Sequence, residues 1–555
     1  MKGKTKIFVW VLCLLIVLVT VYSTVSTVNR TMSSTSDTIY TVIVNSKGNL
    51  WNTSEDVVGN TTICTNIQTA INDLTDGGTV WLPSGTFNIS ALNFKNNVNL
   101  IGNGQATTLR RADNTSTNMI WIGSKCNILI ENIAFEGNNG TTWTYMNTSN
   151  IRIEGTPISQ NVTIKNCYFN NSVGSHIMSN DGAANITVED CYFSNRQRER
   201  YGGAIWFSGP NSIAKNNFIR DTYACGIVYE ETTDDRASGV ADGNTITGEI
   251  GHGIHLGGSY GFAHANISIV NNHIHHLNST AYLDVEKHYS VGIFAGDVSI
   301  VSNNIIENVD KCGIYAFFNS TVSNNIIRNV SGHFSGGKPN VSAGIFVNDS
   351  SIVFGNYIEN VNEHGIYLAG QYGLEEICLV SENKILNTGL NESTETGGIF
   401  WFRGNGTCTN NYIQNADVGI QIGYNKDTQS GKGVTVIGNT ITDVLNGTII
   451  NSNNTIVSAN SIKHCTYFGI NNSGHNCSIS DNIINLCGEN GIDLNDVEHN
   501  ILIGNIVHLC INGITEIGSS DWNIIGANNC LYNSGNAIDI NGANTINSTN
   551  LGTIV

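Results

Sequence analysis

The sequence predicts an all-β solenoid, a parallel β-helix, because a short phrase recurs at a fixed spacing, its apolar residues alternate, and proline is nearly absent. The phrase is Asn, any residue, Ile, any residue, Asn and then Gly-Ile, as in 304–314 and 356–366. Where no loop intervenes, the Ile of Gly-Ile recurs every 21 or 22 residues, as from Ile293 to Ile314 and from Ile470 to Ile492. Such repeats are too short to bury an apolar face alone, so they must stack.

Each repeat is expected to hold two or three short strands closed by tight turns, since segments such as 298–302 alternate apolar and polar residues. Asn suits the corners because it tolerates left-handed backbone and can bond backbone groups. Stacked Asn side chains can also bond one another along the axis. Gly before the inward Ile indicates either a close approach or a positive φ. Only 4 prolines occur, in keeping with intact strand ladders.

The soluble part begins with a predicted amphipathic helix, followed by two strand segments. Residues 67–74 carry an apolar stripe of helical period, and 77–89 and 92–104 follow it. This segment resembles the N-terminal cap and first coils of the pectin-lyase-like superfamily, with GGTV-x-L-P-x-G-x-F and then L-x-G-x-G. The later phrases are similar to the right-handed β-helix repeats of carbohydrate-binding and sugar-hydrolysis domains. The resemblance covers about residues 60–545 and implies a right-handed solenoid, but one fold hosts many activities.

The N-terminus predicts export. Lys2, Lys4 and Lys6 precede an apolar run, so residues 1–28 are expected to be a signal peptide or, with slightly more weight, a membrane anchor. Residues 29–62 are assigned to a linker and first strand, and 63–555 to the β-helix domain with a capping helix near 66–75. We therefore expect an extracellular or cell-surface protein. A cytoplasmic protein is the weaker alternative, because the run is too apolar for a buried helix.

The net charge limits the classes of ligand that the protein is expected to bind. The net charge of −18 argues against nucleic acid. A polyanionic glycan would need a bound cation, such as Ca²⁺, or a local basic patch; no definite cofactor is indicated.

Recurrent Asn-x-Ser/Thr sequons, such as Asn52 and Asn161, suggest a glycoprotein, although Asn is so common that chance explains most of them. Cys465, Cys487 and Cys510 recur at the coil spacing and are expected to be stacked buried thiols rather than disulfides.

Loops that break the period are expected to form two walls beside the Gly-Ile strand. They comprise 195–203, 278–291, 331–343 and 388–397 on one side, and 229–239, 257–265, 369–376 and 424–432 on the other. The residue after each inward Ile should point outward and form the floor of a groove. This outward column is Trp206, Val228, His255, Phe294, Tyr315, Phe346, Tyr367, Phe400, Gln421, Asn471, Asp493, Thr515 and Asp539.

The aromatic part of the outward column is predicted to bind glycan. Its five consecutive rings run from Phe294 to Phe400, and a row of outward rings with a polar rim suits the C–H faces of sugars. Trp206, Arg198 and Arg200 are predicted to add to substrate binding. The alternative is that the rings only stack across strands beneath covering loops.

Catalysis is predicted at the N-terminal end of the outward column. Glu230 and His255 should face outward on neighbouring coils with Cα atoms about 8 Å apart. With Asp234 or Asp235 from the next loop, they are the candidate general acid and base. The alternative is a solvated acidic loop beside an exposed histidine.

No metal site is predicted. We expect His273, His275 and His276 to be corner residues, because alternating side chains cannot all face one metal; a copper or zinc site is the weaker alternative. The absence of any Cys-x-x-Cys pair gives no support for structural zinc.

The segment 251–257 is similar to the Gly-His-Gly strand of polygalacturonases, but the resemblance is incomplete. Ala224 and Cys225 stand where those enzymes carry an Asp pair, and no Arg-x-Lys follows. Polygalacturonase activity is therefore not predicted. Two hypotheses remain. The first is an exported β-helix that binds or acts on polysaccharide, as a lyase or glycoside hydrolase if it is an enzyme. The second is a non-catalytic surface or envelope glycoprotein with a structural or adhesive role.

Overall fold

The structure is a computed structural model. It describes residues 41–43, 61–62, 67–112, 117–137, 148–155, 159–180, 183–195, 203–231, 237–258, 266–277, 290–332, 342–348, 350–370, 377–389, 396–423 and 433–552. Residues Met1–Ile39 and Tyr40–Val555 are separate units, and every described residue belongs to the second. The predicted leader, residues 1–28, lies outside the described residues. Within the described ranges, no helix is both long and apolar enough to cross a membrane.

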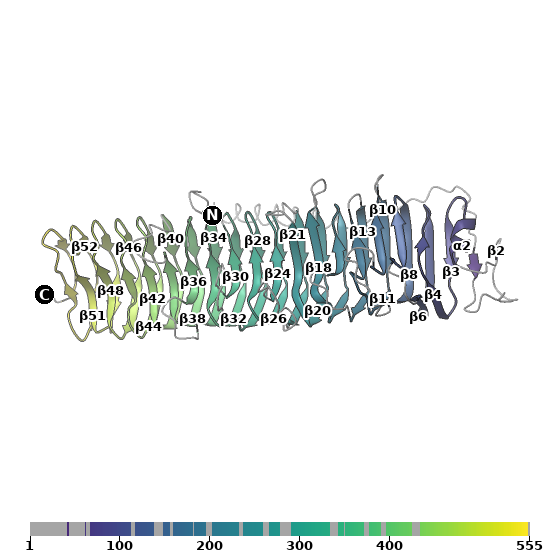
Figure 1. Cartoon of the computed structure of the whole chain (residues 1–555). Coiled ribbons are helices and arrows are strands. Elements are labelled where there is room, and N and C mark those ends of the chain that lie inside the picture. The colour runs from purple at the N-terminus through teal and green to yellow at the C-terminus, as the bar shows by residue number, and fades with distance from the viewer. Residues whose placement is uncertain are drawn as a thin grey trace, which may run out of the picture. The chain divides into compact units, whose positions relative to one another are not determined.

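The unit Tyr40–Val555 is a stack of coils, most of which contain three strands (Figure 1). One coil comprises β27 (Cys312–Ala316), β28 (Thr321–Ser323) and β29 (Ile326–Val330). The next comprises β30 (Ala343–Val347), β31 (Ile352–Phe354) and β32 (Tyr357–Val361). Each strand pairs in parallel with its counterpart, β27 with β30, β28 with β31 and β29 with β32. This arrangement confirms the predicted parallel β-helix.

The strands that carry Gly-Ile line up in one sheet, which we call the Gly-Ile sheet. Its members are β5 (Leu92–Asn93), β7 (Ile120–Gly123), β9 (Ile151–Glu154), β12 (Ile177–Ser179), β15 (Gly203–Phe207), β18 (Tyr223–Glu231), β21 (Ile250–Gly258), β24 (Val291–Ala295), β27, β30, β33 (His364–Leu368), β36 (Gly397–Trp401), β39 (Val418–Ile422), β42 (Asn446–Ile450), β45 (Ile470–Asn472), β48 (Asn490–Asn495), β51 (Asn512–Ile517) and β53 (Ile538–Asp539).

The isoleucines of the Gly-Ile sheet form an inward file. Ile293 pairs with Ile314, Ile366 with Ile399, and Ile399 with Ile420. All of them are fully buried in the main core. The file is interrupted at Thr448, which pairs with Ile420 on one side and Ile470 on the other. The register on which the predicted outward column depends is therefore confirmed.

Asparagine fixes the corners of the coils in two ways. Left-handed residues such as Asn308, Asn329 and Asn360 turn the chain on the surface, with φ of 55°, 57° and 56°. Beside them runs a buried ladder in which each amide nitrogen donates to the amide oxygen one coil on, at 2.9–3.1 Å. Its members are Asn217, Asn244, Asn272, Asn304, Asn325, Asn356, Asn383, Asn411, Asn439, Asn460, Asn482, Asn505, Asn528 and Asn550. The predicted bonding of Asn along the axis is thus confirmed.

The glycine of Gly-Ile is required for close packing rather than for a positive φ. A Cβ at Gly313 would lie 2.6 Å from the carbonyl oxygen of Gly344 and 2.6 Å from Cγ2 of Ile327. The φ of Gly313 is not positive. Of the two explanations left open by the sequence, close approach is correct at this position.

The predicted helix is α2 (Ile67–Asp73), which buries Ile67, Ala70 and Ile71 at the N-terminal end of the core. None of the twelve described cysteines forms a disulfide, and all except Cys126 are buried. Cys465 and Cys487 pair directly across adjacent strands. The stacked thiols were predicted correctly.

Candidate functional site

The predicted outward column exists in the structure. Trp206, Val228, His255 and Phe294 pair in succession, and Phe294 continues through Tyr315, Phe346, Tyr367, Phe400 and Gln421. The prediction omitted Ile449, which stands between Gln421 and Asn471. Beyond it, Asn471, Asp493, Thr515 and Asp539 follow as predicted.

The aromatic rings of the column stack on one another. The centroids of Phe294 and Tyr315 are 5.0 Å apart, and those of Tyr315 and Phe346 are 4.4 Å apart and nearly parallel. The ladder continues to Tyr367, which stacks on Phe346 at 5.1 Å, and then to Phe400, whose ring is tilted by 36° against that of Tyr367 at 5.2 Å. Together with Val291, Cys312 and Ala343, the rings form an apolar cluster separate from the main core. Cross-strand stacking, the alternative left open by the sequence, is therefore present.

The rings differ in how accessible they are. Phe346, Tyr367 and Phe400 are only 2%, 8% and 3% exposed, whereas Phe294 and Tyr315 are partly buried. Burial raises the pKa of the Tyr315 hydroxyl well above its usual value. A ligand that meets this surface would reach Phe294 and Tyr315 first.

His255 continues the ring ladder towards the N-terminus. Its imidazole stacks on Phe294 at 4.9 Å and lies 5.0 Å from the ring of His252. Glu230 pairs with Gly257, two residues beyond His255, while Val228 pairs with His255 itself. Because side chains two residues apart on a strand share a face, Glu230 and His255 lie diagonally on the same side of the sheet. This is the relationship that the sequence predicted.

Four predicted site residues lie outside the described residues: Asp234, Asp235, Arg198 and Arg200. Trp206 is described and packs against Ala224, Cys225 and Val228, with its Nε1 donating to Oγ of Ser208 at 3.2 Å. The functional roles of all the predicted site residues remain predictions.

Two histidines beside the column were not included in the predicted site. His252 pairs with Val291 on the next coil. His364, which directly precedes Gly365, pairs with Ala343 on the preceding coil. The imidazole of His364 stacks on Phe400 at 5.0 Å and lies 5.2 Å from Tyr367. Burial lowers the pKa of His364 to about 3. The recurring His-Gly-Ile motif was the available signal, but the sequence does not show that the imidazole turns towards the aromatic column.

The C-terminal end of the column is polar. Asn490 donates from Nδ2 to Oδ1 of Asp493 at 2.7 Å, and Asn536 donates in the same way to Asp539 at 3.0 Å. Burial raises the pKa of Asp493, while the bond from Asn490 lowers it and nearby Glu489 raises it. Oγ1 of Thr515, on the strand between the two aspartates, has no hydrogen-bond partner among the described residues. This part of the column offers mostly hydrogen-bond acceptors.

His273, His275 and His276, which were expected to be corner residues that cannot all face one metal, lie close together in β23 (His273–Leu277). Nδ1 of His275 and Nδ1 of His276 are 2.9 Å apart, and the rings of His273 and His275 are 4.5 Å apart. His273 and His275 share a face because they are two residues apart on the strand. A bulge brings His276 towards them, because the pairing shifts after Thr247 and His276 adopts a φ of 53°. Even so, no set of three or more His, Cys, Asp and Glu side chains in the described ranges is arranged to hold a metal ion.

Two family models match parts of the chain. A family model described as "Right handed beta helix region" matches residues 204–385, and one described as "Rhamnogalacturonase A/epimerase, pectate lyase-like" matches residues 54–234. They confirm the right-handed parallel β-helix and the resemblance to the pectin-lyase-like superfamily. No curated protein sequence matches the chain.

Several solved structures are similar to the chain at low sequence identity. The surface adhesin PfbA of Streptococcus pneumoniae is 14% identical, with a TM-score of 0.37 over 68% of this chain and 86% of that one. A PL6 alginate lyase in complex with a trisaccharide is 11% identical, with a TM-score of 0.34 over 77% and 86%. The A-module of the mannuronan C-5 epimerase AlgE4 from Azotobacter vinelandii is 15% identical, with a TM-score of 0.28 over 75% and 89%.

Proposed function

We propose that this protein binds polysaccharide through the outer face of the Gly-Ile sheet and acts on it at Glu230 and His255. The observation that carries the proposal is the accessible end of the ring ladder, where Phe294 and Tyr315 adjoin His255 and, diagonally, Glu230. Aromatic faces next to a carboxylate and an imidazole can hold a sugar ring and exchange protons with it. The match to the rhamnogalacturonase and pectate-lyase-like family over residues 54–234 supports a carbohydrate ligand.

The chemistry that these two groups can perform is hydrolysis of a glycosidic bond. Glu230 in its protonated form would donate to the glycosidic oxygen. Neutral His255 would take a proton from the water that attacks the anomeric carbon. The expected Cα separation of about 8 Å places the two residues diagonally on neighbouring strands of one face. A lyase would use the same base to remove a proton from the sugar ring.

The test is to incubate the purified ectodomain with a panel of neutral and uronic polysaccharides. We expect new reducing ends or unsaturated products with at least one polysaccharide, and their loss in Glu230→Gln and His255→Ala. The matched control is Glu359→Gln, which removes a carboxylate 3.4 Å from Arg328 on another face. Products that persist in both site variants would contradict the assignment of the two residues.

A second candidate is a non-catalytic surface protein with an adhesive or structural role. The burial of Phe346, Tyr367 and Phe400 favours it, because a stacked, covered ladder stabilises the sheet without any ligand. Binding of a polysaccharide without products would support this candidate. Placement at the cell surface is part of both candidates and is supported by the apolar run after Lys6. It would be checked by locating the full chain in membrane and soluble fractions.

A further inference from the structure

A second surface feature lies on a different face of the solenoid from the Gly-Ile sheet. It is a cleft of about 350 Å³ formed by β6 (Val98–Arg111), β8 (Cys126–Glu136), β11 (Tyr168–Asn170), β14 (Tyr192–Ser194) and β17 (Phe218–Arg220). All of its lining residues are described. None of them belongs to the outward column, and the sequence did not single out the cleft.

Exposed aromatic rings line the cleft and its edge. Tyr168, Tyr192 and Phe218 occupy the same position on three successive strands. The rings of Tyr192 and Phe218 are 5.4 Å apart and within 4° of parallel, and those of Tyr168 and Tyr192 are 6.3 Å apart. Tyr168 and Phe218 are 36% and 38% exposed, in contrast to the buried rings of the outward column. These three side chains form an accessible aromatic platform.

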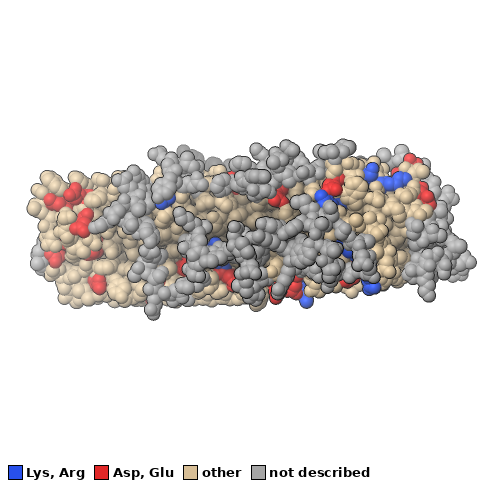
Figure 2. All heavy atoms as spheres, viewed as in Figure 1, with Lys and Arg blue, Asp and Glu red and all other residues tan. Residues whose placement is uncertain are grey.

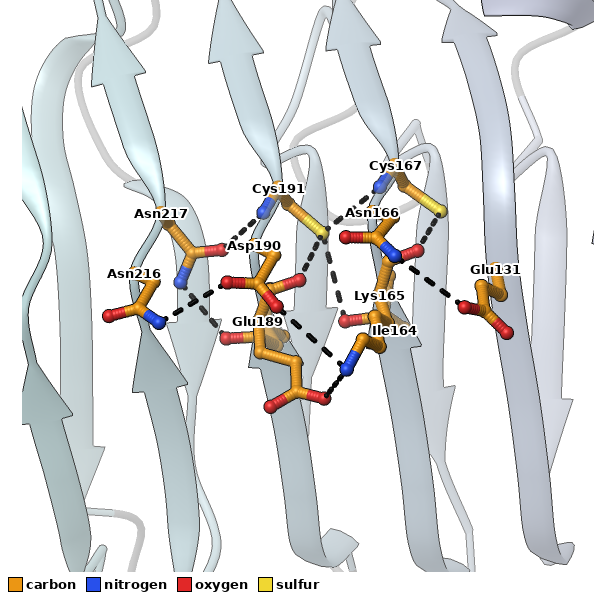
Figure 3. A network of polar contacts seen from close by, with 11 residues as sticks. Glu131, Ile164, Lys165, Asn166, Cys167, Glu189, Asp190, Cys191, Asn216 and Asn217 are labelled. Atoms are coloured by element: carbon orange, nitrogen blue, oxygen red, sulfur yellow. Dashed lines mark hydrogen bonds and ion pairs between the residues drawn. The ribbon is translucent and has the colours of Figure 1, made fainter. Parts of the chain in front are cut away.

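The platform has a rigid foundation. Behind it, the inward rings of Phe135, Phe169 and Phe193 stack at 4.8 Å with planes 5° apart. The corner that precedes Tyr168 and Tyr192 is held by Cys167 and Cys191. The backbone nitrogen of Cys167 donates to Sγ of Cys191 at 3.4 Å (Figure 3). At the same corner, Lys165 pairs with Glu189 at 2.9 Å. The hydrogen bond to Glu189 raises the pKa of Lys165. Rings held in this way lose little freedom on binding.

A polar edge runs beside the rings. Glu136 accepts hydrogen bonds from Nδ2 of Asn170 at 3.1 Å and of Asn171 at 2.6 Å. Oδ1 of Asn170 in turn accepts from Oγ of Ser194 and Nδ2 of Asn195, at 3.1 and 2.9 Å. These amide, hydroxyl and carboxylate groups are oriented by one another and retain unused lone pairs and protons. Flat apolar faces with such an edge match a sugar ring, which has C–H faces and an equatorial rim of hydroxyls.

The charges of the cleft favour a neutral sugar. Glu136 would repel a uronate, and Arg220 is engaged by Asp221 at 3.2 Å. On the face seen in Figure 2, Lys and Arg (blue) and Asp and Glu (red) stand in small groups on a described surface made mostly of other residues. We propose that this cleft is a second carbohydrate-binding site that takes a neutral oligosaccharide on Tyr168, Tyr192 and Phe218. The inference rests on the proposed function only in its ligand class, since the two sites share no residue.

The experiment is calorimetric titration of the purified protein with cellohexaose, xylohexaose and hexagalacturonate. We expect one of the neutral hexamers to bind, and Tyr168→Ala and Tyr192→Ala each to weaken binding by about tenfold or more. The matched control is Tyr412→Ala. Tyr412 pairs with Lys384, which pairs with Tyr357, so it occupies the same face several coils away from the cleft. This variant should bind as the parent does.

Failure of the inference is distinguishable from failure of the proposed function. Loss of binding in Tyr168→Ala and Tyr192→Ala but not in Tyr315→Ala would support the cleft, whatever happens at the outward column. Loss in Tyr315→Ala with unchanged binding in both cleft variants would overturn the cleft and leave the proposed function standing. Tighter binding of hexagalacturonate than of both neutral hexamers, or no binding of any hexamer, would also overturn it.

Discussion

Asn325 donates a hydrogen bond from its side-chain Nδ2 to Oδ1 of Asn356 on the next coil, over 3.0 Å. Oδ1 of Asn325 accepts the equivalent bond from Asn304, also over 3.0 Å. The side chain is fully buried, so these bonds replace water on both sides. One residue type at one corner therefore joins each coil to its two neighbours.

Replacing Asn325 with Leu should lower the free energy of unfolding by about 3 kcal/mol or more. The change removes the acceptor of the Asn304 backbone amide and of Asn304 Nδ2, and it removes the donor that Asn325 Nδ2 supplies to Asn356 Oδ1 and to the Val301 carbonyl. Urea unfolding followed by circular dichroism measures the loss. The control is Asn329→Ala, which removes two bonds of the exposed corner ladder, to Asn308 and from Asn360, and should cost about 1 kcal/mol. Equal losses in the two variants would show that the buried ladder has no special weight.

Replacing Gly313 with Ala should destabilise the fold by about 1–3 kcal/mol through overpacking. The new methyl group would meet Gly344 O and Ile327 Cγ2 at 2.6 Å, and neither can move without shifting a coil. The comparison variant is Gly526→Ala, whose nearest contact would be 3.3 Å. The thermal midpoint should fall clearly only for Gly313→Ala; an unchanged midpoint would mean that adjacent coils separate easily.

Glu516 is a buried carboxylate at a core position, since it pairs with Leu494 of the preceding coil. It accepts hydrogen bonds from Asn523 Nδ2, Thr545 Oγ1 and the Gly542 amide, at 2.8, 2.9 and 3.0 Å. Glu516→Leu should lose about 3 kcal/mol because these donors become unpaired, whereas Glu516→Gln keeps an acceptor and should lose about 1–2 kcal/mol. Hydrogen exchange at Gly542 would report the loosening. A Leu variant as stable as the parent would contradict the prediction.

His364 should make the fold sensitive to acid. Its pKa falls to about 3 through burial, from an ordinary value of 6.5. Between these values the unfolded chain binds a proton that the folded chain does not, so the free energy of unfolding decreases as the pH falls from 6.5 towards 3. The slope due to this residue is at most about 1.4 kcal/mol per pH unit.

The measurement is the urea midpoint at several pH values between 7 and 4. His364→Gln should flatten the dependence, while His464→Gln, at a position whose side chain is 54% exposed, should not. The same slope in the parent and in His364→Gln would exclude His364 as the cause.

The fold could be predicted from the sequence because the repeat fixes register locally. Knowing that Ile314 points inward is sufficient to place Tyr315 outward and Asn325 at a corner. Burial could not be predicted in this way. Whether Phe346 or Tyr168 is accessible depends on what surrounds its face, which the period does not encode.

Local breaks in the pattern explain the remaining errors. Thr448 replaces the inward isoleucine, so no Gly-Ile motif marked Ile449 as part of the outward column. A bulge at His276 brought its imidazole to those of His273 and His275, from which strict alternation would separate it. The aromatic cleft arises from the N-terminal coils, where Tyr168 and Tyr192 follow cysteines rather than the Gly-Ile step.

The stacked strands tolerate very different lengths of intervening chain. Ile254 and Ile293 are 39 residues apart in sequence, and Ile293 and Ile314 are 21 apart, yet both pairs face each other directly. Variation in these insertions can therefore proceed without altering the framework. A foreign peptide grafted between β23 (His273–Leu277) and β24 would be displayed on an unchanged support, which makes the molecule a ready scaffold for engineering new surfaces.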